Sequence, residues 1–339
     1  MSPNPASRPP DQPLRQLVAG FARPKPRAAW WQLTTTAAAF LATWALMAAS
    51  IDWGYGWTLA LAPLAAGLYI RLFIIQHDWG HGSFFAKRWL DHPVGAALGL
   101  ITLVPYGYWK KTHAVHHATS GNLDRRELGD VRTLTVAEYN ARSPLGRFGY
   151  RLYRSAPVLF FFGPIYQFVL KHRFPFDLPF AWKREWASVL WNNLALGVAA
   201  WILGVTLGWW TVLLVHGPIM LIAGAAGVWL FYVQHQFEEA YWERQENWDF
   251  EAAALAGSSF YDLPRVLHWF TGNIGYHHIH HLSSKVPNYR LRECYESSPL
   301  LQKAPRLSLR ASLRCARLKL WDPEARKLVG FPSRRTLEA

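Results

Sequence analysis

The chain begins its hydrophobic pattern with two apolar stretches separated by a short polar turn. Ala28 to Ile51 carries no charged residue, and Trp53 to Ile70 is also uncharged, with the apolar pattern continuing past Arg71 to Ile75. A helix needs about 20 mostly apolar residues to cross a bilayer, and both stretches are long enough. The turn between them contains Gly54 and no Lys or Arg. This part of the chain therefore predicts a hairpin of two transmembrane helices.

A second apolar region runs from Trp186 to Phe237 without a single Asp, Glu, Lys or Arg. As one helix it would be about 78 Å long, which is far more than the thickness of a bilayer. It is therefore expected to form another hairpin that turns at Gly208-Trp209-Trp210. Together the two regions predict four spans, at about 29–50, 55–76, 187–207 and 210–234.

Two shorter apolar segments, Val94 to Tyr106 and Ser155 to Leu170, are expected to be interfacial or re-entrant pieces. The sizeable polar stretches are all basic: the N-terminal arm, Lys110 to Arg154, and Lys285 to Arg335. Neither hairpin turn contains Lys or Arg. Because positive charge collects on the cytoplasmic side of membrane proteins, the polar stretches and both termini are predicted to be cytoplasmic.

Composition agrees with a membrane protein. Hydrophobic residues make up 51% of the chain and charged residues 17%, below the roughly 25% charged content of soluble domains. The net charge of +14 suits nucleic acid, lipid headgroups or an acidic protein, and in a membrane protein the last two are favoured over nucleic acid.

The predicted fold is thus an all-α integral membrane protein. Four transmembrane helices form two hairpins, joined by short interfacial or re-entrant helices and a cytoplasmic helical cap that holds a metal site. Residues 1–27 are expected to be a disordered basic arm, residues 28–298 the membrane domain, and residues 299–339 a basic cytoplasmic tail.

The candidate chemistry lies in three tight groups among the 14 histidines. Each group follows an apolar segment, so all three are expected at one cytoplasmic edge. Spacings of three and four residues place imidazoles about one helical turn apart. Eight rings exceed the needs of one tetrahedral zinc and suit two metals, although imidazole alone does not choose among Zn, Cu, Fe and Ni. The three groups are His77 and His81; His113, His116 and His117; and His277, His280 and His281.

The other histidines carry weaker signals. His235 ends the fourth predicted span, level with the groups, and is either a ligand or an ordinary helix-end histidine. His278 lies off the ligand spacing and is a candidate to support the ligands from behind. His92, His172 and His216 are isolated, and structural roles are expected for them. His268 stays open.

Four acidic residues lie beside the first two groups: Asp78, Asp124, Glu127 and Asp130. Metal-bound imidazoles usually donate their second N–H to a carboxylate or carbonyl, which sets the tautomer. These residues are candidates for that role. The alternative for each is pairing with a nearby Arg125, Arg126 or Arg132 on a solvated face.

The motifs HDWGHGSFF from His77, HAVHHATSGNLDRRELGDV from His113, YVQHQFEEAYW from Tyr232 and WFTGNIGYHHIHHLSSKVPNY from Trp269 resemble the membrane fatty acid desaturase and hydroxylase superfamily. They are most similar to bacterial acyl-lipid desaturases of the omega-6 (delta-12) and delta-5 types. The resemblance covers about Ile70 to Arg292.

The resemblance implies two irons held by the eight histidines of the three groups, with His235 as a ninth ligand. It implies that O2 and two electrons are used to introduce a double bond into a lipid-linked acyl chain. It also implies a separate electron donor, a ferredoxin or a cytochrome b5-like protein, and a place in the bacterial inner membrane. The basic tail, including Arg306, Arg310, Arg314, Arg317 and Lys319, is expected to attract an acidic donor or anionic lipid.

Two other functions remain open from the residues. A hydroxylase or ketolase of the same superfamily, acting on an acyl chain, alkane or carotenoid, would use the same ligands. A metal transporter or sensor is disfavoured, because transporters place ligands near the middle of their spans and these histidines gather at one edge.

Overall fold

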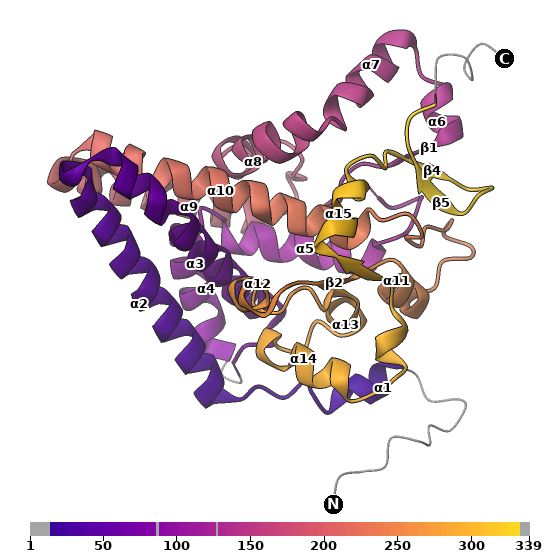
Figure 1. Cartoon of the computed structure of the whole chain (residues 1–339), viewed down its shortest axis with the longest axis horizontal. Helices are drawn as coiled ribbons and strands as arrows, with labels where there is room; N and C mark the ends of the chain where they lie inside the picture. The colour runs from indigo at the N-terminus through magenta and orange to yellow at the C-terminus, as the bar shows by residue number, and fades with distance from the viewer. Residues whose placement is uncertain (1–13, 86–87, 127, 333–339) are drawn as a thin grey trace, which may run out of the picture.

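The computed structural model describes residues 14–85, 88–126 and 128–332, and most of these residues are helical (Figure 1). Among the described residues, four helices are long and apolar enough to cross a membrane. They are α2 (Pro26–Ser50), α3 (Tyr55–His81), α9 (Lys183–Leu207) and α10 (Trp209–His235). The predicted architecture of four spans in two hairpins is therefore confirmed.

Each hairpin turns at a glycine with positive φ. Gly54 follows the short 3₁₀ helix η1 (Ile51–Trp53), has φ of 125°, and caps the start of α3. Gly208 has φ of 89° and lies between the end of α9 and the start of α10. Other residues rarely adopt this backbone conformation, so glycine permits the chain to reverse within a few residues.

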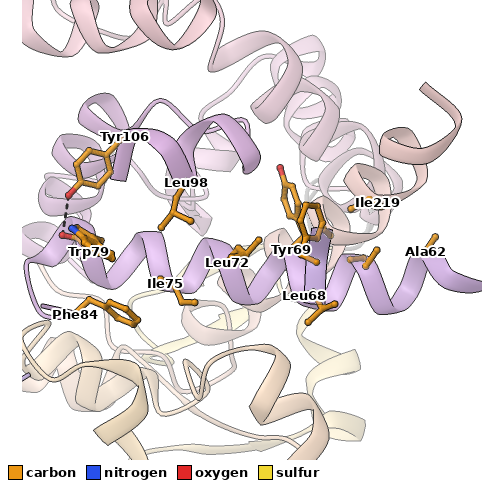
Figure 2. Close-up of a cluster of buried hydrophobic side chains, with 14 of the residues drawn as sticks. Ala62, Leu68, Tyr69, Leu72, Ile75, Trp79, Phe84, Leu98, Tyr106 and Ile219 are labelled. Atoms are coloured by element: carbon orange, nitrogen blue, oxygen red, sulfur yellow. Dashed lines mark hydrogen bonds between the residues drawn. The ribbon is translucent and has the colours of Figure 1, made fainter. Parts of the chain in front are cut away.

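Helix α3 lies at the centre of the bundle and carries the first histidine group at its end. It packs against α2 and α10. In its most apolar 18-residue stretch 61% of the residues are buried, compared with 22% or less in the corresponding stretches of the other three spans. Leu68, Leu72, Ile75 and Trp79 line its buried side (Figure 2). The hydroxyl of Tyr106 donates to the carbonyl oxygen of Trp79 at 3.1 Å. This packing holds the last turn of α3 in place.

Shorter helices surround the histidine-bearing ends of the spans. Before α9 these are η2 (Arg88–Leu90), α4 (Asp91–Ile101), α5 (Tyr106–Thr119), α6 (Val136–Asn140), α7 (Pro144–Tyr153) and a partly π-helical stretch of η3 (Val158–Phe162), α8 (Gly163–Ile165) and η4 (Tyr166–Lys171). After α10 they are α11 (Phe250–Ala256), α12 (Arg265–Phe270), α13 (His277–Leu282), α14 (Asn288–Glu296), η5 (Leu301–Lys303) and α15 (Leu309–Cys315).

Two small sheets add to the predicted all-helical architecture. In one, β1 (Leu134–Thr135) pairs parallel with β4 (Leu320–Asp322), which pairs antiparallel with β5 (Lys327–Val329). In the other, β2 (Phe260–Asp262) pairs parallel with β3 (Arg306–Ser308). Each strand has two or three residues, too few to show an alternating pattern. The pairing nevertheless folds the C-terminal tail onto the rest of the chain.

The N-terminal arm differs from the expected disorder in its second half. Residues 14–19 form α1 (Leu14–Ala19), and Val18 is fully buried in a cluster that includes Ile279 and Leu291. The guanidinium of Arg290 donates to the carbonyl oxygen of Gly20 at 3.1 Å. One buried apolar residue and this hydrogen bond give the segment partners that its polar composition did not reveal. Residues 1–13 lie outside the described residues.

Candidate metal centre

The three histidine groups meet at one end of the helical bundle. The first group occupies the last turn of α3, the second lies on the final turns of α5, and the third begins α13. His235 is the last residue of α10. Nine histidines from four helices therefore share one region, although the third group lies 160 residues or more from the second in sequence.

The nine rings divide into two sets whose nitrogen atoms lie within 4.8 Å of one another. The first set has five members and the second has four. Both three-histidine groups contribute to both sets, because neighbouring residues on a helix point about 100° apart. The first set is His77, His81, His113, His117 and His280; the second is His116, His235, His277 and His281.

Short contacts between Nε2 atoms link the first set. His113 Nε2 lies 3.0 Å from His77 Nε2 and 3.1 Å from His117 Nε2. His117 Nε2 lies 3.0 Å from His280 Nε2. In the second set, His277 Nε2 lies 2.9 Å from His235 Nε2. Within each set, these rings therefore point Nε2 toward a common centre.

Hydrogen bonds alone cannot satisfy the first set. The Nδ1 of His77 lies 3.0 Å from the carboxylate of Asp78, which places the proton of the neutral ring on Nδ1 and leaves a lone pair on Nε2. If His113 donates its one Nε2 proton to His77, it has no lone pair left to accept from His117. At least one of these two contacts therefore cannot be an ordinary hydrogen bond.

A bound cation resolves this conflict, since every inward nitrogen then offers its lone pair to the metal. Two nitrogens at right angles on a metal with bonds of about 2.1 Å would lie about 3.0 Å apart, which matches the observed separations. The inward nitrogens of His116 and His281 are buried and have no other hydrogen-bond partner among the described residues. The donor set fits metal in both positions.

The electrostatics also favour neutral ligands. Burial lowers the pKa of His113, His117 and His280 well below the usual imidazole value, and neighbouring imidazoles lower it further. The same two causes lower the pKa of His277 and His281. These rings are therefore unprotonated near neutral pH, as a metal ligand must be.

Three acceptors orient the rings from behind. Asp78 accepts from His77 and, through its other oxygen, from the backbone N–H of Asn288 at 2.6 Å and its side-chain amide at 2.8 Å. Asp130 lies 2.6 Å from His116 Nδ1. The carbonyl oxygen of Gly257 lies 3.1 Å from His235 Nδ1. Each contact leaves Nε2 free to face the centre of its set.

The remaining supporting candidates behave differently. Asp124 forms a surface ion pair with Arg244 and accepts a hydrogen bond from the backbone N–H of Gln245. It is therefore paired with an arginine on a solvated face, as the alternative interpretation expected, but the arginine is not one of the three that the sequence suggested. His278 turns away from both sets, and its Nε2 lies 2.9 Å from the carbonyl oxygen of Leu301. This structural contact differs from the expected role behind the ligands. Glu127 lies outside the described residues.

The isolated histidines stay apart from the two sets. His92 is exposed, and His172 contacts the side-chain amide of Gln167 at 2.8 Å. His216 lies within α10 against the ring of Tyr69. His268 accepts a long hydrogen bond from the backbone N–H of Leu263. Among the described residues, none of the four faces a metal set.

Three supporting residues were not foreseen from the sequence. The carbonyl of Gly257 and the amide of Asn288 leave no recognisable signal, because backbone and amide partners occur everywhere. Trp109 stacks on His113 with ring centroids 4.5 Å apart and also lies against His77. Its spacing of four residues before His113 was the available signal, since it places both rings on one helical face.

Comparison with known proteins extends the match beyond the histidines. A sequence model of the family described as fatty acid desaturase matches residues 55–307. A fatty acid desaturase of Bacillus subtilis (strain 168) is 46% identical over 318 residues, which cover 94% of this chain and 90% of that protein.

Two more distant relatives are also desaturases. An sn-1 acyl-lipid omega-3 desaturase (ferredoxin) of Synechocystis is 30% identical over 253 residues, 71% of this chain and 67% of that protein. A delta(12)-fatty-acid desaturase of Arabidopsis thaliana is 28% identical over 248 residues, 68% of this chain and 63% of that protein.

Proposed function

The chain belongs to the fatty acid desaturase family and is an O2-dependent oxidoreductase, and from this premise we propose that it desaturates acyl chains carried on membrane lipids. We further propose that its nine clustered histidines hold two irons, five ligands for one and four for the other. The observation that carries this proposal is the division of the rings into two all-nitrogen sets at the ends of apolar spans.

The proposed irons would supply the oxidation that desaturation needs. Two hydrogens leave neighbouring carbons, and together with two electrons and two protons they reduce O2 to two water molecules. The chain's own residues have simpler roles. The nine histidines offer neutral lone pairs, while Asp78 and Asp130 keep the Nδ1 protons of His77 and His116 in place. Most of the rings are buried, so bulk water is largely excluded from the centre.

A lipid-linked substrate is supported by where the site lies. Ligands from the last turns of α3 and α10 place the two sets directly at the end of membrane-spanning helices. An acyl chain lying among the spans can therefore present its carbons to the site without leaving an apolar environment. The Synechocystis relative is named as an acyl-lipid desaturase, which supports the same class of substrate.

A separate ferredoxin-like or cytochrome b5-like donor is proposed for the two electrons. The name of the Synechocystis relative includes ferredoxin. On the tail of this chain, the side chains of Arg310, Arg314 and Arg317 are exposed. Fewer basic side chains of the tail are available to a partner than the sequence predicted. Lys319 is buried and donates to the carbonyl oxygen of Arg154, while Arg306 pairs with Asp262. The absence of Lys and Arg from both hairpin turns supports a cytoplasmic orientation of the site.

The test is expression in a bacterial host that makes only saturated and monounsaturated lipids. Gas chromatography with mass spectrometry of the fatty acids should show a new double bond, and it should appear in the phospholipid fraction. A His280→Ala chain at equal abundance in the membrane is the control and should leave the profile unchanged. No new double bond from abundant, iron-loaded protein would contradict the desaturase assignment. A product that retained label from ¹⁸O2 would instead indicate a hydroxylase.

A further inference from the structure

Helix α7 has its apolar side outward. Leu145 is 78% exposed, Phe148 is 63% exposed and Leu152 is 53% exposed. Their spacing of three and four residues places them in one stripe along the helix. A surface helix of a soluble protein turns such a stripe toward the core and its charges toward water. Here the stripe faces away from the protein. Figure 1 shows α7 extending outward from the body of the molecule, beyond α8.

The polar side of α7 is turned toward the protein. Tyr150 is buried, and its hydroxyl accepts from the backbone N–H of Leu134 at 3.1 Å. The guanidinium of Arg151 donates to the hydroxyl of Tyr139 at 2.6 Å. The capping residue Arg154 is fully buried. A helix that turns its arginines toward the protein and exposes an apolar stripe is suited to contact with lipid, because in water the stripe would be an exposed hydrophobic patch.

The segment that follows α7 is also apolar and exposed, and it lies against a membrane span. The next segment, Val158 to Lys171, is an apolar helical stretch with Phe161, Phe162 and Tyr166 more than half exposed. It packs on span α10, where a Cβ at Gly224 would lie only 2.8 Å from the Cβ of Pro164. The segment that directly follows α7 is therefore attached to a membrane-spanning helix.

The charge of this region fits lipid headgroups. From Tyr139 to His172 the chain contains no Asp or Glu, and Arg142 and Arg147 are partly exposed just before and within α7. Lys and Arg beside an apolar helix face are typical of helices that lie in the membrane interface. Headgroup phosphates offer the matching negative charge.

We propose that α7 lies in the plane of the lipid–water interface on the histidine side of the membrane, with Leu145, Phe148 and Leu152 inserted among the lipid acyl chains. This contact is additional to the four spans. The side is given by Arg154, whose guanidinium donates at 2.8 Å to the side chain of Gln236, the residue after His235.

Hydrogen bonds connect α7 to the segment that supports the metal centre. The buried side of α7 holds the segment that precedes β1, because Arg154 donates to the carbonyl oxygen of Arg132 at 3.1 Å and to the Thr133 hydroxyl at 3.2 Å. Asp130, two residues before Arg132, contacts His116. Hydrogen bonds therefore link α7 to the segment that carries Asp130, the partner of His116.

The experiment attaches an environment-sensitive nitrobenzoxadiazole label to the full chain in nanodiscs of phosphatidylcholine and phosphatidylglycerol. Phe148→Cys reports on the stripe, and Glu324→Cys in the exposed turn between β4 and β5 is the matched aqueous control. Wild-type chain carried through the same labelling measures the background from Cys294 and Cys315. Lipids with a nitroxide on the acyl chain provide the quencher.

The expected result is emission at shorter wavelength for the label at Phe148, with several-fold stronger quenching by the lipid nitroxide than at Glu324. Equal emission and quenching at the two positions would overturn the proposal. Shielding without lipid quenching, together with disulfide cross-linking between two Phe148→Cys chains, would assign the stripe to a second copy and also overturn it. If Phe148→Cys misfolds, shown by raised labelling of the native cysteines, Leu152→Cys repeats the test on the same stripe.

Discussion

His116 and Asp130 face each other across 14 residues of chain, with Nδ1 of His116 2.6 Å from Oδ1 of Asp130. His116 is fully buried, and the exposed fraction of the Asp130 side chain is 7%. The contact joins helix α5, which carries the second histidine group, to the segment that leads into β1. It makes Asp130 the carboxylate that sets the tautomer of one proposed ligand of the second set.

Replacing Asp130 with asparagine should therefore weaken metal binding. The neutral amide holds the His116 proton less strongly, and loss of such a supporting contact typically lowers metal affinity by about 10- to 100-fold. Competition of the iron-loaded protein with a chelator measures the change. Asp124→Asn is the matched control, because Asp124 lies on the surface with Arg244. Equal iron retention in the two variants would contradict the role assigned to Asp130.

His280 and His278 are two residues apart on α13 and should respond differently to alanine. His280 belongs to the first set, so His280→Ala should lower bound iron and abolish desaturation. His278 contacts the carbonyl oxygen of Leu301, so His278→Ala should keep its iron while losing about 1 kcal/mol or more of folding free energy. Iron per chain and thermal unfolding in detergent separate these effects. Iron loss from His278→Ala in a still-folded protein would show that the ligand assignment is incomplete.

Gly80 should not tolerate alanine, because a Cβ there would lie 2.6 Å from Cζ3 of Trp109. The ring of Trp109 also stacks on His113, so it cannot move freely. Overpacking of this kind typically costs about 1–3 kcal/mol. Thermal unfolding of Gly80→Ala should reveal the loss.

Two comparisons sharpen this test. Gly217→Ala in α10 meets no atom within 4 Å and should leave stability unchanged or raise it slightly, because alanine is the better helix former. Adding Trp109→Phe to Gly80→Ala should recover part of the loss, since the overlapping ring becomes smaller. Identical unfolding temperatures for the two single glycine variants would refute the packing argument.

The two cysteines should be nearly inert in the folded protein. Burial raises the pKa of the Cys294 thiol to about 12, and that of the Cys315 thiol to about 12. A raised pKa keeps the thiol protonated, so at pH 8 the thiolate fraction is on the order of a thousandfold below that of a free cysteine. Alkylation by iodoacetamide, followed by mass spectrometry, should be slow until the chain is unfolded. Rapid modification of the native chain would show that these thiols are accessible.

Much of the fold and the site was predictable because the signals are local. Residues 186–237 without charge require a hairpin, and the glycine at position 208 marks its turn. The three histidine groups share one edge because each follows an apolar segment. His235 was expected level with them, and it lies against His277.

Other features depend on contacts between distant segments. Asp124 and Asp130 follow His117 by 7 and 13 residues, and only the path of the chain turns Asp130 toward His116 and Asp124 toward Arg244. Strands β2 and β3 pair across more than 40 residues, and strands this short carry no pattern of their own. Helix α1 is ordered by burial of Val18 against distant residues.

By itself the sequence determined the membrane-spanning hairpins and the identity of the clustered imidazoles, because hydrophobic length and helical spacing act within one segment. Only the tertiary structure decided how the rings divide. His113 and His117 join one set while His116, between them, joins the other. Residues so close on a helix point in different directions, and their partners depend on where α3, α10 and α13 meet α5. The division into five and four is therefore a property of helix packing.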